Sequence, residues 1–475
     1  TCFDGVRRVP QGTTWVFDGH GELKSRTGHW KPDLDIRPGV KDGAEYREEF
    51  KRLLSEAVAS RMTGSRDRIA ACVSGGLDSS AVASVAQSLA SGRDAELRTF
   101  SGIFAGAPVS VDERRYVHSV VSRGGYDPKF VLVDYGKPLR DARVQLGVVG
   151  QPFSGTALYI NWRVYIAAAE AGVSVLLDGV GGDVAVSDGA EWLLHLIERR
   201  SLSRFNAEVG AIASRMGLSR YKVTEKYLWT YLDGCATRRD WDRVRAGLNL
   251  LATELGRGAV VAYVRAAQNL ALSGDQVGLR HQPPAGPVGL LKPRIQEAVQ
   301  DEGSGDVGRW GHPSDSPSDS HRRAIVGGEV QTQIEANEPA AAYWGVECRS
   351  PFLDRRLVEF CMRLPLEWKI RDGWQRYILR EALVGILDDE VRWRTWKSDL
   401  NQGFFGEFGP KEASFLLGRI GHVPGLEDLF DIQLLSGWLE KLAQRQRLGQ
   451  EEIWGVYHIW MLSEWLWSRA SSTDH

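Results

Sequence analysis

The sequence predicts an α/β protein built on a parallel sheet and followed by a large helical part. Four short apolar runs in the first 180 residues have the length of buried strands; they are RIAACV, LRTFSGIF, FVLVD and VSVLLD. Helical patterns separate them, near residues 79–90, 113–123 and 158–171. Strands and helices that alternate in this way are typical of a parallel sheet covered on both faces. After about residue 190 the apolar spacing is almost wholly helical.

Two segments lie outside this alternation. Residues 1 to about 40 alternate and turn, as in TTWVFDGHG, and predict short strands, whereas residues 42–61 have apolar residues at helical spacing. Residues 274–323 are rich in Pro, Gly, Ser and Asp, as in HQPPAGP and HPSDSPSDSH. Such a composition buries little apolar surface, so we expect a mobile loop or lid there.

Composition and charge exclude several classes of protein. The chain has 475 residues, of which 43% are hydrophobic and 25% charged, as in soluble globular proteins of one large or several smaller domains. A net charge of -2 gives no general attraction to nucleic acid or to an anionic membrane. No run of about 20 apolar residues is present to span a bilayer. We therefore expect neither a nucleic-acid partner nor a membrane span.

The five cysteines favour a reducing compartment. They are scattered along the chain, at positions 2, 72, 235, 348 and 361. No CxxC pair or neighbouring His cluster accompanies them, so the sequence predicts neither a zinc site nor a disulfide framework. No signal peptide is apparent, and a cytoplasmic protein is the expectation. The chain begins with Thr1 rather than Met, which suggests a piece of a longer protein.

A glycine-rich loop between the first buried run and the following helix carries the strongest chemical signal. It comprises Ser74, Gly75, Gly76, Leu77, Asp78, Ser79 and Ser80. Glycines allow the backbone to approach a ligand, and the helix directs free N–H groups and its positive dipole end toward it. The kinase-type G-x-x-x-x-G-K-[ST] loop is absent from the chain. The alternative is a plain glycine turn with a Ser/Asp helix cap, but the complete motif after a strand favours a phosphate or pyrophosphate site.

Two further motifs lie far along the chain. LLDGVGGDVAVSDG, residues 176–189, is a second glycine-rich turn after a buried run and contains Asp183, which on its own reads as a turn residue. GVECRSPFLDRRLVEFCMRLPLEWKIRDGWQRYILREAL, residues 345–383, by itself reads as an amphipathic helical segment with charge pairs.

The three motifs together resemble a known family. SGGLDSS is similar to the PP-loop of the N-type ATP pyrophosphatases, and the second and third motifs resemble the asparagine synthetase superfamily. The resemblance implies an adenine nucleotide α-hydrolase-like fold that binds ATP and Mg2+ and releases AMP and pyrophosphate. It implies that Asp78 and Asp183 hold Mg2+, that residues 74–80 bind the nucleotide together with Gly179, Gly181 and Gly182, and that Lys397 contacts the phosphates.

The same resemblance gives an organisation of the chain. Residues 1–40 look like the last strands of a glutaminase-like domain, and residues 41–470 like the ATP-dependent synthetase domain. Cys2 is then expected not to be a glutaminase nucleophile, because this segment resembles the far end of that domain. Glu347 lies in a region that helps to orient the acceptor. Asp112 and Glu113 match a family pattern that reads as structural.

The second loop distinguishes members of the superfamily. Asparagine synthetases carry a glutamate three residues before the metal-binding aspartate, and this chain has Val180 there, which cannot take a proton from an amine. DGVGGDVAVSDG instead resembles the DG-x-GGD-x-VVSHG motif of lasso-peptide macrocyclases, with Asp188 where His is expected. The residues Lys397, Ser398, Asp399, Leu400 and Phe404 are similar to a further motif of that group.

This narrower resemblance implies a reaction and partners. A precursor peptide would have an Asp or Glu side chain adenylated, and its own N-terminal amine would attack to close a macrolactam. The partners would be a leader-peptide-binding protein and a cysteine protease of the same pathway. The alternatives are an asparagine synthetase or another small-molecule amide synthetase, and, in a different class, a degenerate scaffold without activity. Trp374, Trp393 and Trp396 are neighbours of Lys397 that read mainly as core residues and secondarily as a peptide site.

Overall fold

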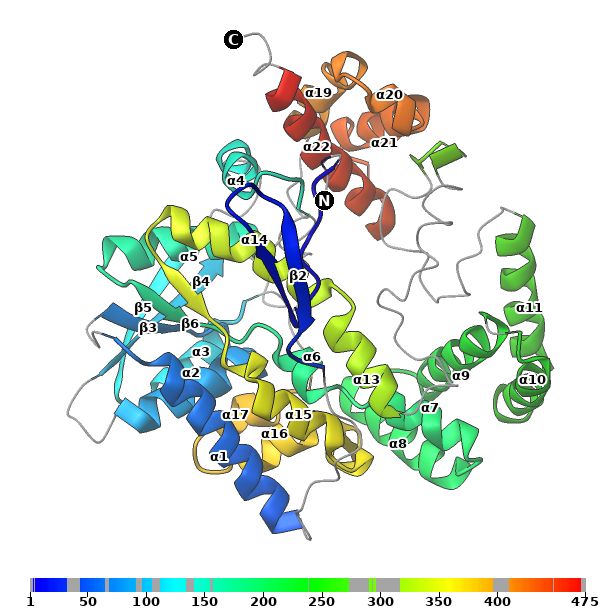
Figure 1. Ribbon diagram of the computed structural model, residues 1–475. Helices are drawn as coiled ribbons and strands as arrows, with labels where there is room; N and C mark the ends of the chain where they lie inside the picture. The colour runs from blue at the N-terminus through cyan, green and yellow to red at the C-terminus, as the bar shows by residue number, and fades with distance from the viewer. Residues whose placement is uncertain are drawn as a thin grey trace.

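A five-stranded parallel sheet organises the α/β part of the protein (left in Figure 1). The computed structural model describes residues 3, 5–31, 43–64, 68–90, 96–104, 112–133, 141–153, 157–237, 239–272, 290–292, 294–295, 317–395, 410–446 and 448–470. The strands of the sheet are β3 (Ile69–Cys72), β4 (Leu97–Phe104), β5 (Tyr126–Val133), β6 (Val175–Leu177) and β7 (Glu347–Arg349). The predicted parallel sheet is confirmed, and β4 coincides with the apolar run LRTFSGIF.

The order of the strands places a topological switch point at the carboxyl ends of β3 and β6. The order is β5-β4-β3-β6-β7, so the chain builds outward from β3 in one direction and then returns to its other side with β6. Ile69 of β3 pairs with Val175 of β6, and Ala70 of β3 pairs with Arg98 of β4. The connections that leave β3 and β6 therefore diverge, and in open α/β sheets ligands bind at this switch point, outside the carboxyl ends of the strands.

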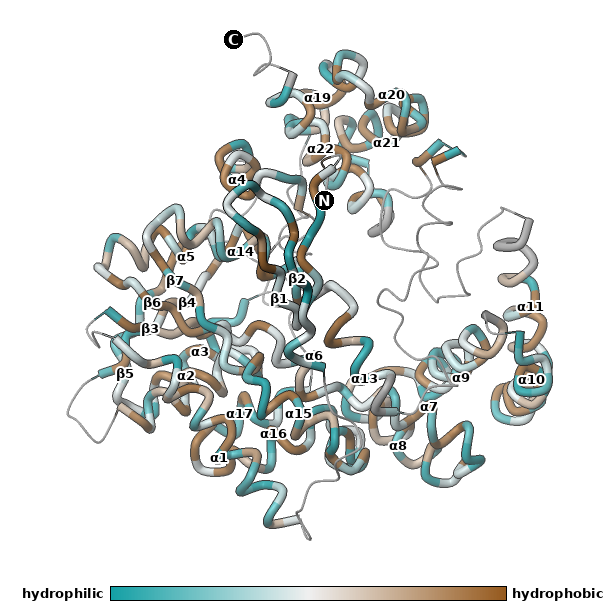
Figure 2. Tube along the Cα trace, viewed as in Figure 1, coloured by the Kyte–Doolittle hydropathy of each residue, from teal (hydrophilic) through white to brown (hydrophobic). Residues whose placement is uncertain are grey.

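Helices cover both faces of the sheet, as the alternation of strands and helices predicts. Successive strand residues face opposite sides, so Ala70 and Leu176 belong to one hydrophobic core and Ala71 and Leu177 to the other. β6, whose three residues are all hydrophobic (brown in Figure 2), is buried throughout. One face is covered by α1 (Gly43–Arg61), α2 (Leu77–Ala90), α3 (Arg114–Val121), α15 (Arg355–Arg363), α16 (Tyr377–Ala382) and α17 (Asp389–Arg392).

The opposite face continues into the C-terminal helices. It packs against α4 (Ala142–Val149), α5 (Ala157–Glu170) and α14 (Glu329–Tyr343). The same core extends through α19 (Pro410–Leu417), α20 (Leu426–Leu429), α21 (Ile432–Ala443) and α22 (Gln450–Ala470). A separate core belongs to α7 (Ala190–Glu198), α8 (Leu202–Met216), α9 (Arg220–Thr237), α10 (Trp241–Leu255) and α11 (Arg257–Leu272), which lie together on one side of the molecule (Figure 1).

Two regions differ from the sequence-based interpretation. The block 345–383 is not one helical segment: the edge strand β7 comes first, then the amphipathic helix α15, then a two-stranded hairpin of β8 (Ile370–Arg371) and β9 (Trp374–Gln375), and finally α16. β7 has three residues, too few for a recognisable period, and is held by pairing with β6. Within the predicted loop 274–323, the last residues belong to α13 (Pro317–Val326), and His321 is buried there.

An N-terminal hairpin lies against this body. β1 (Thr13–Phe17) and β2 (Leu23–Gly28) pair in antiparallel fashion, with an irregularity between Val16 and Phe17. They agree with the short strands predicted for residues 1–40. Trp30, just after the hairpin, donates its indole N–H to Glu359 of α15 at 2.8 Å. No helix in the described part of the chain is both long enough and apolar enough to cross a membrane.

Candidate active site

Two glycine-rich loops meet at the switch point of the sheet. The first connects β3 to α2 through Ser74, Gly75 and Gly76, and α2 begins at Leu77 with Asp78 in its first turn. The second leaves β6 through residues 178–181 and enters the short helix α6 (Gly182–Val186), whose first turn holds Asp183. The two aspartates therefore stand at the N-termini of two helices that begin at the same edge of the sheet.

The second loop is packed directly onto the first. A Cβ atom on Gly179 would lie 2.5 Å from the backbone nitrogen of Ser79, and one on Gly182 would lie 2.7 Å from the carboxyl carbon of Asp78. A Cβ on Gly181, which has a φ of +78°, would lie 2.4 Å from the side chain of Leu353. Glycine is therefore required at positions 179 and 182 for the loops to touch, and the positive φ at position 181 also favours glycine.

Hydroxyl groups organise the first loop. Ser79 Oγ accepts a hydrogen bond from the backbone nitrogen of Ser74 at 3.1 Å and lies 2.8 Å from Ser74 Oγ. Ser74 is exposed, which leaves its hydroxyl accessible from solvent. Leu77 and Ser80, also expected at the site, are buried in the core beneath it, so their side chains support the loop rather than face the edge.

An arginine occupies the space in front of the two aspartates. Arg376 Nη1 lies 2.6 and 2.8 Å from the two carboxylate oxygens of Asp78. Burial disfavours the charge of Arg376, but Asp78 and Asp183 outweigh it and raise the pKa of the guanidinium. Arg376 has a φ of +51°, an uncommon value outside glycine, and it stands at the N-cap of α16. Strained backbone of this kind is concentrated at functional sites.

A second arginine holds the backbone of the first loop. Arg394 Nη1 donates to the carbonyl oxygen of Gly75 at 2.9 Å, and Nη2 pairs with Glu113 at 2.9 Å. The guanidinium carbon lies 3.9 Å from the centre of the Tyr116 ring. Glu113, which the resemblance reads as structural, therefore orients Arg394 against the loop.

A buried charged network lies under α6. The ammonium of Lys369 lies 3.0 Å from Glu191 Oε1 and 2.9 Å from His321 Nδ1. His321 Nε2 lies 2.8 Å from the carbonyl oxygen of Val184, in α6 itself. Ser187 donates its hydroxyl to Glu191 at 2.7 Å. Lys369, which can only donate, requires His321 Nδ1 to accept, so the proton of this neutral histidine is on Nε2 and is donated to Val184.

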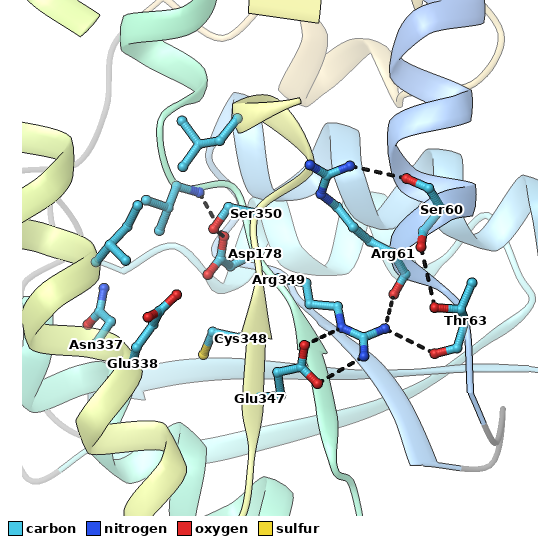
Figure 3. A pocket seen from close by; sticks show the side chains of 13 residues that line it. Ser60, Arg61, Thr63, Asp178, Asn337, Glu338, Glu347, Cys348, Arg349 and Ser350 are labelled. Carbon is cyan, nitrogen blue, oxygen red and sulfur yellow. Dashed lines mark hydrogen bonds and ion pairs between the residues drawn. The ribbon is translucent and has the colours of Figure 1, made fainter. Parts of the chain in front are cut away.

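A pocket of about 460 Å3 opens beside the second loop, at the ends of β6 and β7 (Figure 3). Asp178 lines this pocket and accepts hydrogen bonds through Oδ1 from Ser350 at 2.7 Å and from the backbone nitrogen of Val180 at 3.0 Å. Burial raises the pKa of Asp178 to about 6. Glu347 lines the same pocket and pairs with Arg349 at 2.8 Å.

The residues present fit a magnesium ion that is shared with phosphate. Among the described residues, no three His, Cys, Asp or Glu side chains gather closely enough to hold a metal alone. Magnesium, however, is usually bound through one or two carboxylates together with substrate phosphates and water. Asp78 and Asp183 lie on touching loops at the N-termini of two helices, and they could supply the two carboxylates of such a site.

The other predicted residues are distributed as follows. Lys397, with Ser398, Asp399, Leu400 and Phe404, lies outside the described residues, as does Trp396. Trp374 and Trp393 pack together with ring centres 4.9 Å apart, and the guanidinium carbon of Arg215 lies 4.3 Å from the Trp374 ring. Asp188 accepts from the backbone nitrogen of Ala190 at 2.9 Å at the start of α7.

Sequence reasoning missed four residues of these arrangements. Arg376 and Lys369 lie within the third motif and Arg394 shortly after it, whereas His321 lies in the stretch 274–323 that the sequence predicts as a loop. The only signal was the position of Arg376 and Lys369 within the third motif.

Comparison with known proteins agrees with the geometry. The family model described as asparagine synthase matches residues 49–467. A curated relative, asparagine synthetase [glutamine-hydrolyzing] 3 of Bacillus subtilis (strain 168), is 47% identical over 49 residues. That match spans 10% of this chain and 8% of the relative's length. Because the family model covers most of the chain, including both loops and the sheet between them, the chain belongs to the asparagine synthase family.

Proposed function

We propose that this protein is an ATP-dependent amide ligase that activates a carboxylate as its adenylate, releases pyrophosphate and forms a carbon–nitrogen bond with an amine. The observation that carries the proposal is the contact between the two glycine-rich loops, which brings Asp78 and the helix of Asp183 to one edge of the sheet. Membership of the asparagine synthase family supports the same class of reaction.

The residues of the loops have separate tasks in this proposal. Backbone N–H groups at the start of α2 and the hydroxyl of Ser74 would bind phosphate oxygens, since helix N-termini favour anions. Asp78 and Asp183 would hold Mg2+, which would offset negative charge on the leaving pyrophosphate. Arg376, already within hydrogen-bond distance of Asp78, would add a positive charge on the same side. Lys397 stays a prediction for a phosphate contact.

We further propose that the substrate is a peptide and the product a macrolactam. Val180 supports this, because it removes the glutamate that asparagine synthetases carry at this position, and DGVGGDVAVSDG resembles the loop of lasso-peptide macrocyclases. The acceptor carboxylate would be an Asp or Glu side chain of a precursor peptide, and the attacking group its N-terminal amine. A leader-peptide-binding protein and a cysteine protease remain the proposed partners in the cytoplasm.

The test combines two readouts in one preparation. The protein is incubated with Mg-ATP and synthetic peptides that carry a free N-terminal amine and one internal Asp or Glu at stepped positions. We expect ATP–pyrophosphate exchange that depends on the peptide, AMP formation, and a peptide lighter by one water. Arg52→Ala, on the exposed face of α1, is the matched control and should behave as the wild type.

The second candidate is an asparagine synthetase, which the 49-residue match to the Bacillus subtilis protein favours. In that case AMP forms only when aspartate is supplied with ammonia or glutamine, and the peptides leave unchanged. Absence of exchange with every carboxylate would contradict both candidates and support a scaffold.

A further inference from the structure

The pocket beside the second loop adjoins the proposed nucleotide site. It is bounded by the end of α1, by α14 and by the ends of β6 and β7 (Figure 3). Val180 and Leu353 are among the residues that line it. Leu353 touches Gly181, and Val180 is the next residue toward Asp178. The pocket and the proposed nucleotide site therefore share the turn 179–181 as a common wall, one on each side.

The orientation of Asp178 leaves one carboxylate oxygen available. Oδ1 accepts both hydrogen bonds, from Ser350 and from the nitrogen of Val180. Within the described part of the chain, Oδ2 makes no hydrogen bond. The side chain is fixed by two donors at the wall that divides the pocket from the proposed nucleotide site, and Oδ2 remains to accept a proton.

The surroundings of Asp178 favour proton uptake. Burial raises the pKa of Asp178 to about 6, although the hydrogen bonds from Ser350 and Val180 act to lower it. The negative charge of Glu338 raises this pKa further. The other titratable groups near it are Cys72, Cys348 and Tyr165. Burial raises the pKa of Cys348 to about 12 and raises that of Tyr165, so neither group removes a proton near neutral pH.

The remaining groups of the pocket are less suited to the task. Glu347 is paired with Arg349, which lowers the pKa of its carboxyl and makes it a weaker base. Arg61 is paired with Asp354 at 3.0 Å and is a cation. Glu338 is exposed to solvent, whereas Asp178 is held in place by two hydrogen bonds beside the turn 179–181.

We infer that Asp178 is the general base of the amide-forming step and that the pocket binds a primary amine, a role that rests on the proposed function. The amine nitrogen attacks the acyl carbon of the adenylate, and a carbon–nitrogen bond forms. The bond from that carbon to the phosphate oxygen breaks, and AMP leaves with the electron pair. Asp178 Oδ2 takes the proton that the nitrogen loses and returns it to solvent through the pocket. Asp178 thereby supplies the base that Val180 cannot.

The test separates the two half-reactions in Asp178→Asn, in which the amide oxygen can keep both hydrogen bonds. Adenylation is followed by peptide-dependent ATP–pyrophosphate exchange, and acyl transfer by loss of one water from the peptide. Hydroxylamine is added as a second acceptor, because it is neutral at pH 7 and attacks without a base. We expect exchange and hydroxamate formation to stay within about threefold of wild type, and macrolactam formation to fall about 10²- to 10⁴-fold.

Glu48→Gln, an exposed carboxylate of α1 outside the pocket, is the control for loss of a negative charge, and its rate of macrolactam formation should stay within about threefold. A pH profile adds a readout that a structural role would not move: wild-type macrolactam formation should rise as pH increases through about 6, and this rise should disappear in Asp178→Asn. The melting temperature of Asp178→Asn at pH 7.5 should be no lower than that of wild type, since a buried carboxylate with a raised pKa is costly when charged.

The results of these assays distinguish a general base from a structural residue. Macrolactam formation near the wild-type rate in Asp178→Asn would overturn the role of Asp178 alone. A parallel fall of exchange, hydroxamate and macrolactam would show a structural role and also overturn it. Absence of exchange in the wild-type protein would overturn the proposed function and this inference with it.

Discussion

Two ion pairs at opposite ends of α6 resemble each other chemically and differ in burial. Arg376 pairs with Asp78 at 2.6 Å, and the two side chains are 19% and 20% exposed. Lys369 pairs with Glu191 at 3.0 Å, and these side chains are 0% and 3% exposed. The first pair stands in front of the N-terminus of α6, where Asp183 lies, and the second is linked through His321 to the carbonyl oxygen of Val184.

The difference in burial separates chemistry from support. A partly exposed pair can exchange its partner for a ligand, because water and a phosphate compensate the charge that is released. A fully enclosed pair has no such substitute, so it fixes the atoms around it. The Lys369 network therefore holds α6, and with it Asp183, while the pair of Arg376 with Asp78 stays open to exchange.

The largest effect should come from breaking the enclosed pair. Lys369→Met leaves the Glu191 carboxylate buried without its cation, and we expect a loss of about 3–5 kcal/mol of folding free energy. Chemical denaturation measures it. Arg52→Ala, which breaks exposed pairs with Glu49 and Glu56, should cost less than about 1 kcal/mol.

The double variant Lys369→Met with Glu191→Gln sharpens this test. The introduced glutamine side chain is uncharged and can still accept from Ser187, so the double variant should recover much of the stability lost in the single one. A single variant as stable as wild type, or a double variant less stable than the single one, would show that the network does not hold α6.

The open region should show the reverse pattern, with activity lost and stability kept. Asp183 is exposed, so Asp183→Asn removes one metal-binding charge without leaving a buried charge unpaired. We expect pyrophosphate release to fall about 10²- to 10³-fold, equivalent to about 3–4 kcal/mol in the barrier, at an unchanged melting temperature. Asp78→Asn should lose activity to a similar degree. Full retention of pyrophosphate release in both variants would contradict the assignment of Asp78 and Asp183.

The sequence predicts the open region well because its signals are local. The loop 74–80 and the second loop at 176–189 each consist of contiguous residues after an apolar run, and the strands that carry them were placed within a few residues. Only the contact between the loops, through Gly179 and Gly182, required the fold.

The enclosed region could not be predicted, because its members are far apart in the chain. Lys369 lies 178 residues from Glu191 and 48 from His321, so no local pattern in the sequence connects them. His321 even fell within the stretch 274–323 that composition assigns to a loop. The strand of Glu347 was missed for a related reason, since β7 is defined by its pairing with β6 rather than by its own three residues.

The smallest of the predicted effects is a pH dependence that belongs to the enclosed region alone. Burial, followed by the charge of Lys369, lowers the pKa of His321 to about 3, whereas an unfolded histidine titrates near 6.5. Below pH 6.5 the unfolded chain takes up a proton that the folded protein does not, so this group makes stability fall as the pH drops toward 3. Between pH 7 and pH 5 the loss from this one group is about 2 kcal/mol.

His321→Gln isolates that contribution, because glutamine can donate to the carbonyl oxygen of Val184 but does not titrate. Free energies of unfolding are measured at pH 7, 6 and 5 for wild type and variant, with His20→Gln, an exposed histidine of the β1–β2 turn, as the matched control. Between pH 7 and pH 5, the free energy of unfolding of the wild type should fall by about 2 kcal/mol more than that of His321→Gln. Parallel curves would mean that His321 is open to water and that the network under α6 is not enclosed. At pH 7 the folded wild type holds His321 neutral. The rate of pyrophosphate release by each variant should then be proportional to its folded fraction, because the network supports Asp183 without taking part in the reaction.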